Sequence, residues 1–230
     1  MVEFQDGELY KEYHILWNFR KDGKPILCPR SNFGGKSAIQ DFSQVLWDSG
    51  EKVFQDVAKK MWPKLSCVFI GLERERESDG LKLWAQTDAQ YRQTMKAVLD
   101  DENVEDGGCI HDGQEKALDL TIEATQGPMY KKIEIGAARK PTSLIPAKSK
   151  VTLDSLRQKE PNPDELYARV TFEETEQLLQ DFLEREGVNL DDLGQEELKV
   201  SHQNDRESLD DKFNKLKAKV DAPDDNDIPL

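Results

Sequence analysis

The stretch with the clearest chemical pattern is Gly35-Lys36-Ser37, which follows a predicted strand and precedes a predicted helix. In a phosphate-binding loop, backbone amides at a helix N-terminus bind phosphate, a lysine neutralises it and a hydroxyl holds magnesium. The complete signature has glycine five positions before Gly35, where this chain has Arg30. An ordinary glycine-rich loop is therefore favoured. The functional alternatives are a non-catalytic anion site at Lys36 and Ser37 and a degenerate phosphate-loop enzyme.

A second candidate is the pair Cys109 and His111 beside Asp112, which offers a thiol and an imidazole as metal ligands or as nucleophile and base. A structural zinc site needs four ligands, and the other cysteines and histidines are scattered along the chain. The acidic run at 100–106 lacks the alternating ligands of a calcium loop. The sequence therefore predicts no metal site, no cofactor and no catalytic residue.

Nucleic-acid binding on a sheet face is a further alternative. Residues 131–150 carry six basic residues against one acidic residue. Arg74 and Arg76 on a strand, with Trp17 and Trp84 as stacking platforms, would complete a single-strand or nucleotide-cap site. Core packing explains the tryptophans, and the acidic tail can fold back on the basic segment. RNA or cap binding is therefore not the favoured function.

The strongest pattern for protein binding lies in a predicted helix from about Asp205 to Val220. Its apolar side chains recur at steps of four, three and four residues, and they are Leu209, Phe213, Leu216 and Val220. Such a heptad seam is too narrow for a large core and suits one partner helix. The sequence leaves open whether that helix belongs to another protein or to the same chain.

The net charge of −14 is concentrated in the last third of the chain. Residues 151–230 contain 22 acidic and 10 basic residues, whereas residues 1–150 contain 24 and 22. An acidic segment repels nucleic acid and anionic membrane surfaces and attracts basic partners. We therefore predict a protein partner, basic or helical, and no membrane partner. A solvated, partly disordered tail is the alternative.

The element that would organise the fold is a long amphipathic helix at 37–62. Apolar side chains recur in it at helical spacing, and Ser37 with Gln40 predicts a capping box at its start. Pro63 ends the helix because proline lacks the amide hydrogen. Asp48-Ser49-Gly50 can divide the helix in two.

A hairpin is predicted directly after this helix. The apolar run Leu65–Leu72 predicts the most buried strand of a sheet, and charged residues continue it into solvent as far as Glu77. Asp79-Gly80 predicts a tight turn before the return strand Leu81–Ala85. This register sets Lys82 opposite Glu77, a favourable pairing of charges.

Two further hairpins and a helix complete the predicted domain. They are the strands Leu9–Phe19 and Pro25–Cys28, the helix Asp88–Leu99, and the strands Leu118–Glu123 and Tyr130–Ile135. Pro25 favours an edge position for its strand. Hairpins joined by helices predict the α+β class, with an antiparallel or mixed sheet built from three hairpins and helices on one face.

The predicted division of the chain has four parts. They are an α+β sandwich domain at 1–137, a basic linker at 138–150, an acidic helical extension at 151–220 and a disordered tail at 221–230. Within the extension, Thr171 and Glu174 predict a capping box for a helix that ends at Gly187.

The predicted compartment is intracellular. No stretch approaches the ~20 apolar residues of a membrane span, and Met1–Gly7 lacks the pattern of a signal peptide. Three widely spaced cysteines favour reduced thiols. We expect a cytoplasmic location, with the nucleus also open. The favoured function is a non-enzymatic adaptor or regulatory protein that binds a protein partner through its acidic C-terminal helices.

Overall fold

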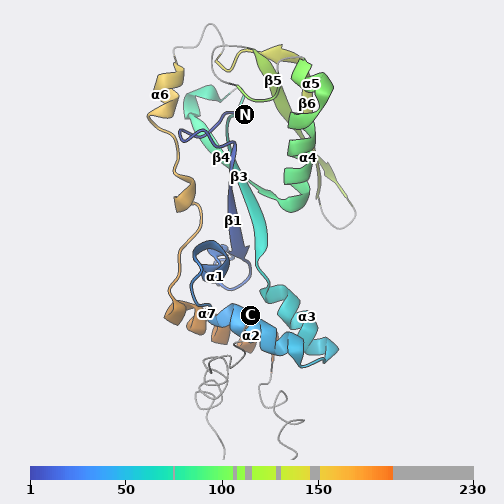
Figure 1. The fold of residues 1–230 in the computed structure, drawn as a ribbon, viewed down its shortest axis with the longest axis vertical. Helices are drawn as coiled ribbons and strands as arrows, with labels where there is room; N and C mark the ends of the chain where they lie inside the picture. Colours follow the sequence, from blue (N-terminus) through green and yellow to red (C-terminus); the bar gives the residue numbers. More distant parts are fainter. Residues whose placement is uncertain (75, 106–107, 112–115, 128–130, 146–150, 189–230) are drawn as a thin grey trace, which may run out of the picture.

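The computed structural model describes residues 1–74, 76–105, 108–111, 116–127, 131–145 and 151–188. Figure 1 shows an elongated molecule with strands at one end and a group of helices at the other. In chain order the elements are β1 (Tyr10–Leu16), β2 (Ile26–Leu27), α1 (Pro29–Phe33), α2 (Ala38–Asp48), α3 (Lys52–Met61), β3 (Lys64–Leu72), η1 (Glu77–Asp79), β4 (Leu81–Thr87), α4 (Asp88–Leu99), α5 (Asp101–Glu105), β5 (Ala117–Gln126), β6 (Lys131–Thr142), α6 (Leu153–Arg157), η2 (Pro163–Glu165) and α7 (Phe172–Glu186). Helices and antiparallel sheets occur together, which confirms the predicted α+β class.

Four strands form the main sheet in the order β2-β1-β3-β4, and each neighbouring pair is antiparallel. β3 lies between β1 and β4, and its residues Ser66–Ile70 are buried. The prediction that the apolar run forms the most buried strand is therefore confirmed. β2 follows Pro25 at one edge of the sheet, as predicted.

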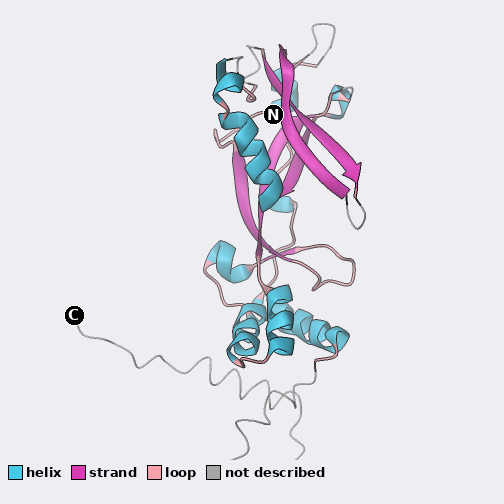
Figure 2. Ribbon diagram, turned by 90° about the vertical axis from the view of Figure 1, so that its right-hand side faces the viewer, coloured by secondary structure: helices cyan, strands magenta, loops and turns pink. Residues whose placement is uncertain are grey.

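The third pair of strands does not join this sheet. β5 and β6 form a separate two-stranded ribbon, so one sheet built from three hairpins is not confirmed. Leu118 and Leu120 of the ribbon pack instead with Val98 of α4 and with Cys109. This contact buries Leu118 and partly buries Leu120 without any pairing to the sheet. Figure 2 shows the ribbon diverging from the sheet toward its turn.

The helices occupy two places. α4 packs on one face of the sheet, where the ring of Tyr91 lies 6.3 Å from that of Phe69 and its hydroxyl donates a 3.0 Å hydrogen bond to Tyr10. α2, α3 and α7 lie together at the end of the sheet (Figure 1). The expectation of helices on one face therefore holds for α4 alone. The apolar stripes of α2, α3 and α7 instead bury one another together with the end of β1.

The predicted long helix at 37–62 is two helices. α2 ends at Asp48 and α3 begins at Lys52. Between them, Gly50 has a φ of 75°, a left-handed conformation that glycine adopts without a steric penalty. α3 then folds back along α2, and it ends at Met61 before Pro63 as predicted.

The other face of the sheet is covered by the chain after β6. Leu156 packs with Ile70, and Tyr167 packs with Val68. In Figure 1 this segment runs along the sheet from α6 to α7. Residues 138–142, expected in a linker, belong to β6. The division into domains stays a prediction, but residues 151–188 pack on the sheet and on α2 instead of standing apart.

The predicted connection between β3 and β4 is wrong. β3 ends at Leu72, and Glu77 lies in the short helix η1 and not opposite Lys82. The Lys82 ammonium donates instead to the carboxylates of Glu73 at 2.5 Å and Asp79 at 3.2 Å. Both acidic residues therefore reach one lysine at the end of the strand, in place of the predicted pair.

The first predicted strand is shorter than the apolar alternation suggests. β1 ends at Leu16, and Asn18 adopts a left-handed conformation with φ of 68°. This turn sends Phe19 away from the sheet, and its ring stacks on Phe182 of α7 with centroids 4.7 Å apart. Among the described residues, no helix combines the length and apolar character needed to cross a bilayer.

Candidate functional site

A polar network around Asp119 joins an arginine, a histidine and a threonine to one carboxylate. The Asp119 carboxylate accepts hydrogen bonds from Arg74 Nε at 2.9 Å, Arg74 Nη2 at 2.7 Å and Thr142 Oγ1 at 2.8 Å. His111 Nε2 lies 3.2 Å from the same carboxylate. Arg74 Nη1 also donates to the Leu144 carbonyl at 2.7 Å. The network thus joins the end of β3 to β5, β6 and the segment that follows β6.

The charge states in this network follow from its burial. Burial lowers the pKa of His111, which is 1% exposed, and the nearby Asp119 opposes that shift without reversing it. Burial alone would raise the pKa of Asp119, but hydrogen bonds from Arg74 and Thr142 outweigh it and lower that pKa. A neutral imidazole beside a carboxylate must donate through Nε2. His111 Nδ1 is then a buried acceptor with no hydrogen-bond partner among the described atoms.

Cys109 is unsuited to nucleophilic chemistry. It is 1% exposed, its thiol donates to the Ala97 carbonyl at 3.5 Å, and burial raises its pKa. A nucleophilic cysteine needs an accessible thiolate. Cys109 and His111 therefore act as packing and hydrogen-bonding groups. Cys28, Cys67 and Cys109 are all free and buried.

The Gly35-Lys36-Ser37 stretch leads into α2 as predicted. Ser37 is buried and caps the helix by accepting a hydrogen bond from the Gln40 amide at 3.5 Å. The Ala38 amide donates to Thr175 Oγ1 of α7 at 3.3 Å. Two of the amides that an anion would need therefore already have partners within the chain. Anion binding at Lys36 and Ser37 stays a prediction.

The residues of the predicted nucleic-acid site lie apart. Trp17 follows the end of β1 that pairs with β2, whereas Trp84 of β4 pairs with Phe69 near the opposite end of β1. Arg74 is committed to the Asp119 network. The Arg76 guanidinium is largely exposed and lies 3.6 Å from the Glu73 carboxylate. The structure does not bring the two tryptophans together on one surface.

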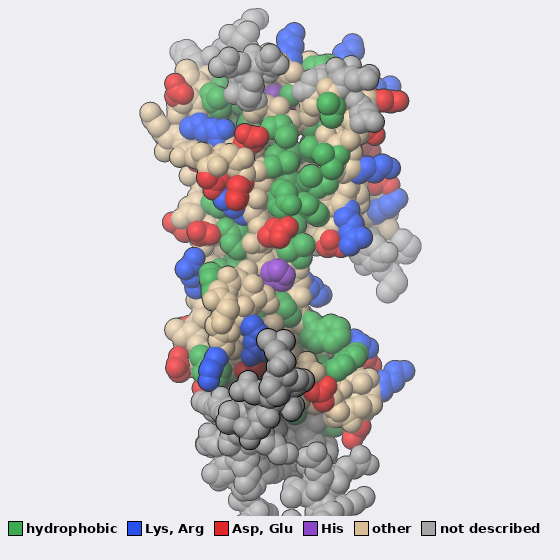
Figure 3. All heavy atoms as spheres, viewed as in Figure 1, with side chains coloured by type: hydrophobic (Ala, Val, Ile, Leu, Met, Phe, Trp, Pro, Cys, Tyr) green, Lys and Arg blue, Asp and Glu red, His purple; other side chains and the backbone are tan. Residues whose placement is uncertain are grey.

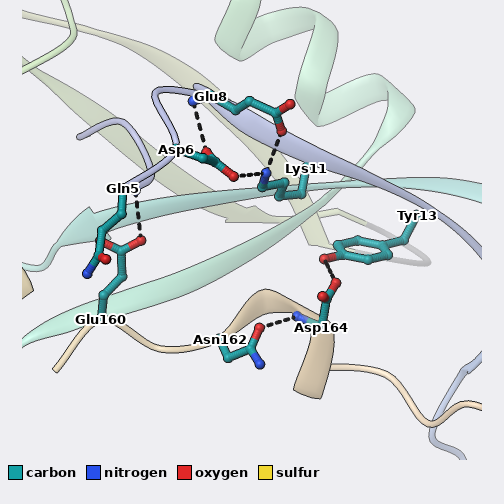
Figure 4. A network of polar contacts seen from close by, with 8 residues as sticks. All are labelled: Gln5, Asp6, Glu8, Lys11, Tyr13, Glu160, Asn162 and Asp164. Carbon is teal, nitrogen blue, oxygen red and sulfur yellow. Dashed lines mark hydrogen bonds and ion pairs between the residues drawn. The ribbon is translucent and has the colours of Figure 1, made fainter.

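A polar cleft of about 370 Å³ lies between the N-terminal segment and residues 160–164 (Figure 4). Tyr13 donates to Asp164 Oδ1 at 2.7 Å, and the Gln5 amide donates to Glu160 Oε1 at 3.2 Å. These bonds hold the chain after β6 against β1. No local pattern predicts these bonds, because the partners are separated by about 150 residues in the chain.

Two acidic residues of this cleft, Asp6 and Glu160, form ion pairs, whereas Asp164 accepts its hydrogen bond from the Tyr13 hydroxyl. Lys11 forms ion pairs with Asp6 and Glu8, and the hydrogen bond from Lys11 lowers the pKa of Asp6. Arg157 Nη1 lies 3.0 Å from the Glu160 carboxylate. Nowhere in the described part of the chain do three or more histidine, cysteine or acidic side chains form a group able to hold a metal ion.

A second cleft of about 420 Å³ lies beside α2 and the end of α3. Trp62 lines it and is 42% exposed, and its ring lies 4.9 Å from that of Trp47. Arg30 and Asp41 form an ion pair on another side of the cleft. The cleft therefore combines an exposed indole ring with an ion pair of arginine and aspartate.

The predicted partner-binding residues Leu209, Phe213, Leu216 and Val220 lie outside the described residues. The described structure ends at Val188, which packs against the core that contains α7.

Comparisons of the chain with protein-family models, with curated proteins and with solved structures found no match.

Proposed function

We propose that this chain is a non-enzymatic adaptor that binds a protein partner through its acidic C-terminal segment. The partner contact is the apolar seam of Leu209, Phe213, Leu216 and Val220. The proposal is supported chiefly by the contrast between α7 and the sequence that follows it.

α7 has the apolar surface of a core helix. Leu179, Phe182 and Leu183 are at most 5% exposed and pack with α2 and α3. Gly187 ends the helix in the left-handed conformation, with φ of 65°. α7 therefore fixes the start of the acidic segment to the folded body, on the helical end of the molecule.

The predicted helix at 205–220 offers much less apolar surface. Its four seam residues occupy one narrow stripe, while Asp211 falls on the opposite side at 100° per residue. A stripe of this width buries well against a single helix. The reactive groups of the described chain support binding over catalysis, since Cys109 and His111 are buried and hydrogen-bonded within the fold.

The experiment is affinity capture from native lysate with the full-length chain and two matched variants. Leu209→Asp combined with Phe213→Asp destroys the seam, whereas Asp211→Asn changes the opposite side of the same predicted helix. We expect the double variant to lose its protein partner, because each central apolar contact contributes about a 30-fold change in affinity. The Asp211 variant should retain the partner.

A truncated chain that ends at Val188 serves as a further control, because it keeps the whole of α7. Removing residues 151–188 would delete Leu179 and Phe182 from the core, and the loss of binding would then report unfolding. Nuclease treatment of each eluate is the second control. Material that survives the double substitution and disappears with nuclease would overturn the proposal in favour of nucleic-acid binding. A lowered melting temperature of the double variant would show that the seam packs on its own chain.

A further inference from the structure

One edge of the β5–β6 ribbon is open to solvent. β6 faces α4, and the Ile135 amide donates to Gln93 Oε1 of that helix at 2.9 Å. On the other side, no described strand pairs with the outer edge of β5. Residues 121–126 of β5 are all exposed, and the Ile122 side chain is 52% exposed. An exposed edge of this kind is a template for pairing with another strand.

The hydrogen bonds of the ribbon determine which backbone groups point outward. The amide of Ile135 points away from β5, toward Gln93. In an antiparallel pair, two opposite residues either exchange both hydrogen bonds or both point away from each other. Ile122 lies opposite Ile135, so its amide and carbonyl point to the open edge. With a period of two, those of Leu120 and Ala124 do the same.

A second observation agrees with this assignment. The Leu118 amide, on the same side of β5, donates to the Gly108 carbonyl at 2.7 Å. The edge is therefore closed at Leu118 by the chain itself, and from Leu120 onward no strand in the described part of the chain pairs with it.

The sequence of β5 is complementary to itself in one antiparallel register. Centred on Ile122, the pairing sets Ile122 opposite its own copy, Leu120 opposite Ala124 and Thr121 opposite Glu123. Apolar residues then meet on one face, and no like charges lie opposite each other. A register centred on Glu123 would oppose two carboxylates, and its central backbone groups would point toward β6.

We propose that β5 is a dimerisation strand, at which a second copy of this chain pairs antiparallel about Ile122. The two ribbons then form one four-stranded sheet in the order β6-β5-β5-β6, with about six new backbone hydrogen bonds. The two-fold axis passes between the two copies of Ile122, which closes the assembly at two chains. Ile133 and Ile135 extend the apolar face on both sides of Ile122.

Charge sets the conditions under which the dimer forms. Each chain carries a net charge of −14, so two copies repel each other at low ionic strength. Charge on the ribbon itself is partly compensated, since Lys132 lies 2.5 Å from the Glu134 carboxylate. The dimer should therefore tighten as salt screens the repulsion between the two chains.

The test uses the full-length chain with a single new cysteine. Ile122→Cys places two thiols opposite each other across the axis, within the reach of a disulfide. Glu123→Cys is the matched control, because its two copies are diagonal neighbours more than about 7 Å apart. Cys28, Cys67 and Cys109 are buried and should not compete. We expect mild oxidation to give covalent dimer at least about tenfold faster for Ile122→Cys. Equal rates for the two variants would overturn the register.

Sedimentation equilibrium supplies the second measurement. The unmodified chain should show a monomer–dimer equilibrium that strengthens with salt. Ala124→Pro removes an outward amide and leaves the bonds between β5 and β6 in place, so dimerisation should weaken about tenfold or more. A chain that stays monomeric at every concentration, or a proline variant that dimerises as well as the unmodified chain, would overturn the proposal. Capture of another protein through residues 209–220 has no bearing on either outcome.

Discussion

The helical end and the ribbon end of this molecule are held in place by different forces. At the helical end, Ile39, Leu46, Met61, Leu179 and Phe182 are completely buried and come from three helices. Such contacts are non-directional and depend on how well the side chains fill space.

At the ribbon end, the smaller apolar cluster around Val98 and Leu118 is supplemented by the network around Asp119. Hydrogen bonds of this kind depend on direction and charge state, and a buried partner left unpaired costs more than the bond itself contributes. The helical end should therefore respond mainly to changes of side-chain volume, and the ribbon end to changes of charge. Substitutions and changes of pH can therefore distinguish the stability of the helical end from that of the ribbon end.

The largest effect is expected from Phe182→Ala. Phe182 is completely buried and stacks on Phe19, so its truncation leaves a cavity among α2, α3 and α7. We expect a loss of about 4 kcal/mol in the free energy of unfolding, measured by denaturant titration. Val53→Ala on the same helical group is the control, because that side chain is 72% exposed, and it should change stability by less than about 0.5 kcal/mol. A Phe182 variant as stable as the control would contradict the importance of this packing.

A smaller loss is expected from Asp119→Asn, which keeps the volume of the side chain and removes its charge. Arg74 and His111 would lose their shared carboxylate while remaining largely buried. We expect the free energy of unfolding to fall by about 2 kcal/mol. Amide hydrogen exchange should become faster in β5 and β6 and stay unchanged in α7. Asp79→Asn is the control at an exposed ion pair and should leave both measurements nearly unchanged. Uniformly faster exchange across the molecule would argue against a network that acts on the ribbon.

The helical end was largely predictable because its signals are local. Apolar spacing predicted α2 and α3, and Pro63 and Gly50 marked where the chain must end or divide a helix. Thr171 and Glu174 form the predicted capping box of α7. Each of these features depends on residues within a few positions of one another, where propensity and backbone geometry decide the outcome.

The ribbon end could not be predicted in the same way. Arg74 and Asp119 are 45 residues apart in sequence, and nothing around either residue marks it as the partner of the other. Asp119 alternates with apolar residues in β5, which predicts a solvent-facing carboxylate and not a network. The separation of β5 and β6 from the main sheet likewise depends on the packing of α4 against the ribbon, which is a tertiary contact that local sequence does not predict. The Asp119 network depends on the burial of His111 next to an acidic residue, and burial cannot be read from a sequence.

Acidification should weaken the ribbon end selectively through His111. Its pKa is lowered in the fold, so above about pH 6.5 the imidazole is neutral in both states and costs nothing. As the pH falls below that value, the unfolded chain takes up a proton that the folded chain resists, and stability falls by up to about 1.4 kcal/mol per pH unit.

The measurement is denaturant unfolding between about pH 7.5 and 5.5, above the range in which most carboxylates titrate. His111→Gln retains a donor for Asp119 without a titrating imidazole, so we expect the slope to become smaller. The slope that remains belongs to the N-terminal ammonium of Met1, whose pKa burial also lowers. His14→Gln, on β1 and outside the network, should leave the slope as it is in the unmodified chain. A slope unchanged by His111→Gln would assign the whole effect to another group.

The smallest effect should come from a buried hydrogen bond between the start of α2 and Thr175 of α7. Thr175 is completely buried, and its hydroxyl accepts from the Ala38 amide at 3.3 Å while donating to the Phe172 carbonyl at 2.6 Å. Thr175→Val preserves the shape of the side chain and leaves the Ala38 amide without this partner. We therefore expect the free energy of unfolding to fall by about 1 kcal/mol. Exchange of the Ala38 amide should accelerate more than that of its neighbours in α2. Equal acceleration along α2 would mean that packing, and not this bond, joins the two helices. In that case the directional contacts of the helical end would be exposed ones such as the ion pair between Lys60 and Glu186, and its contrast with the ribbon would be sharper still.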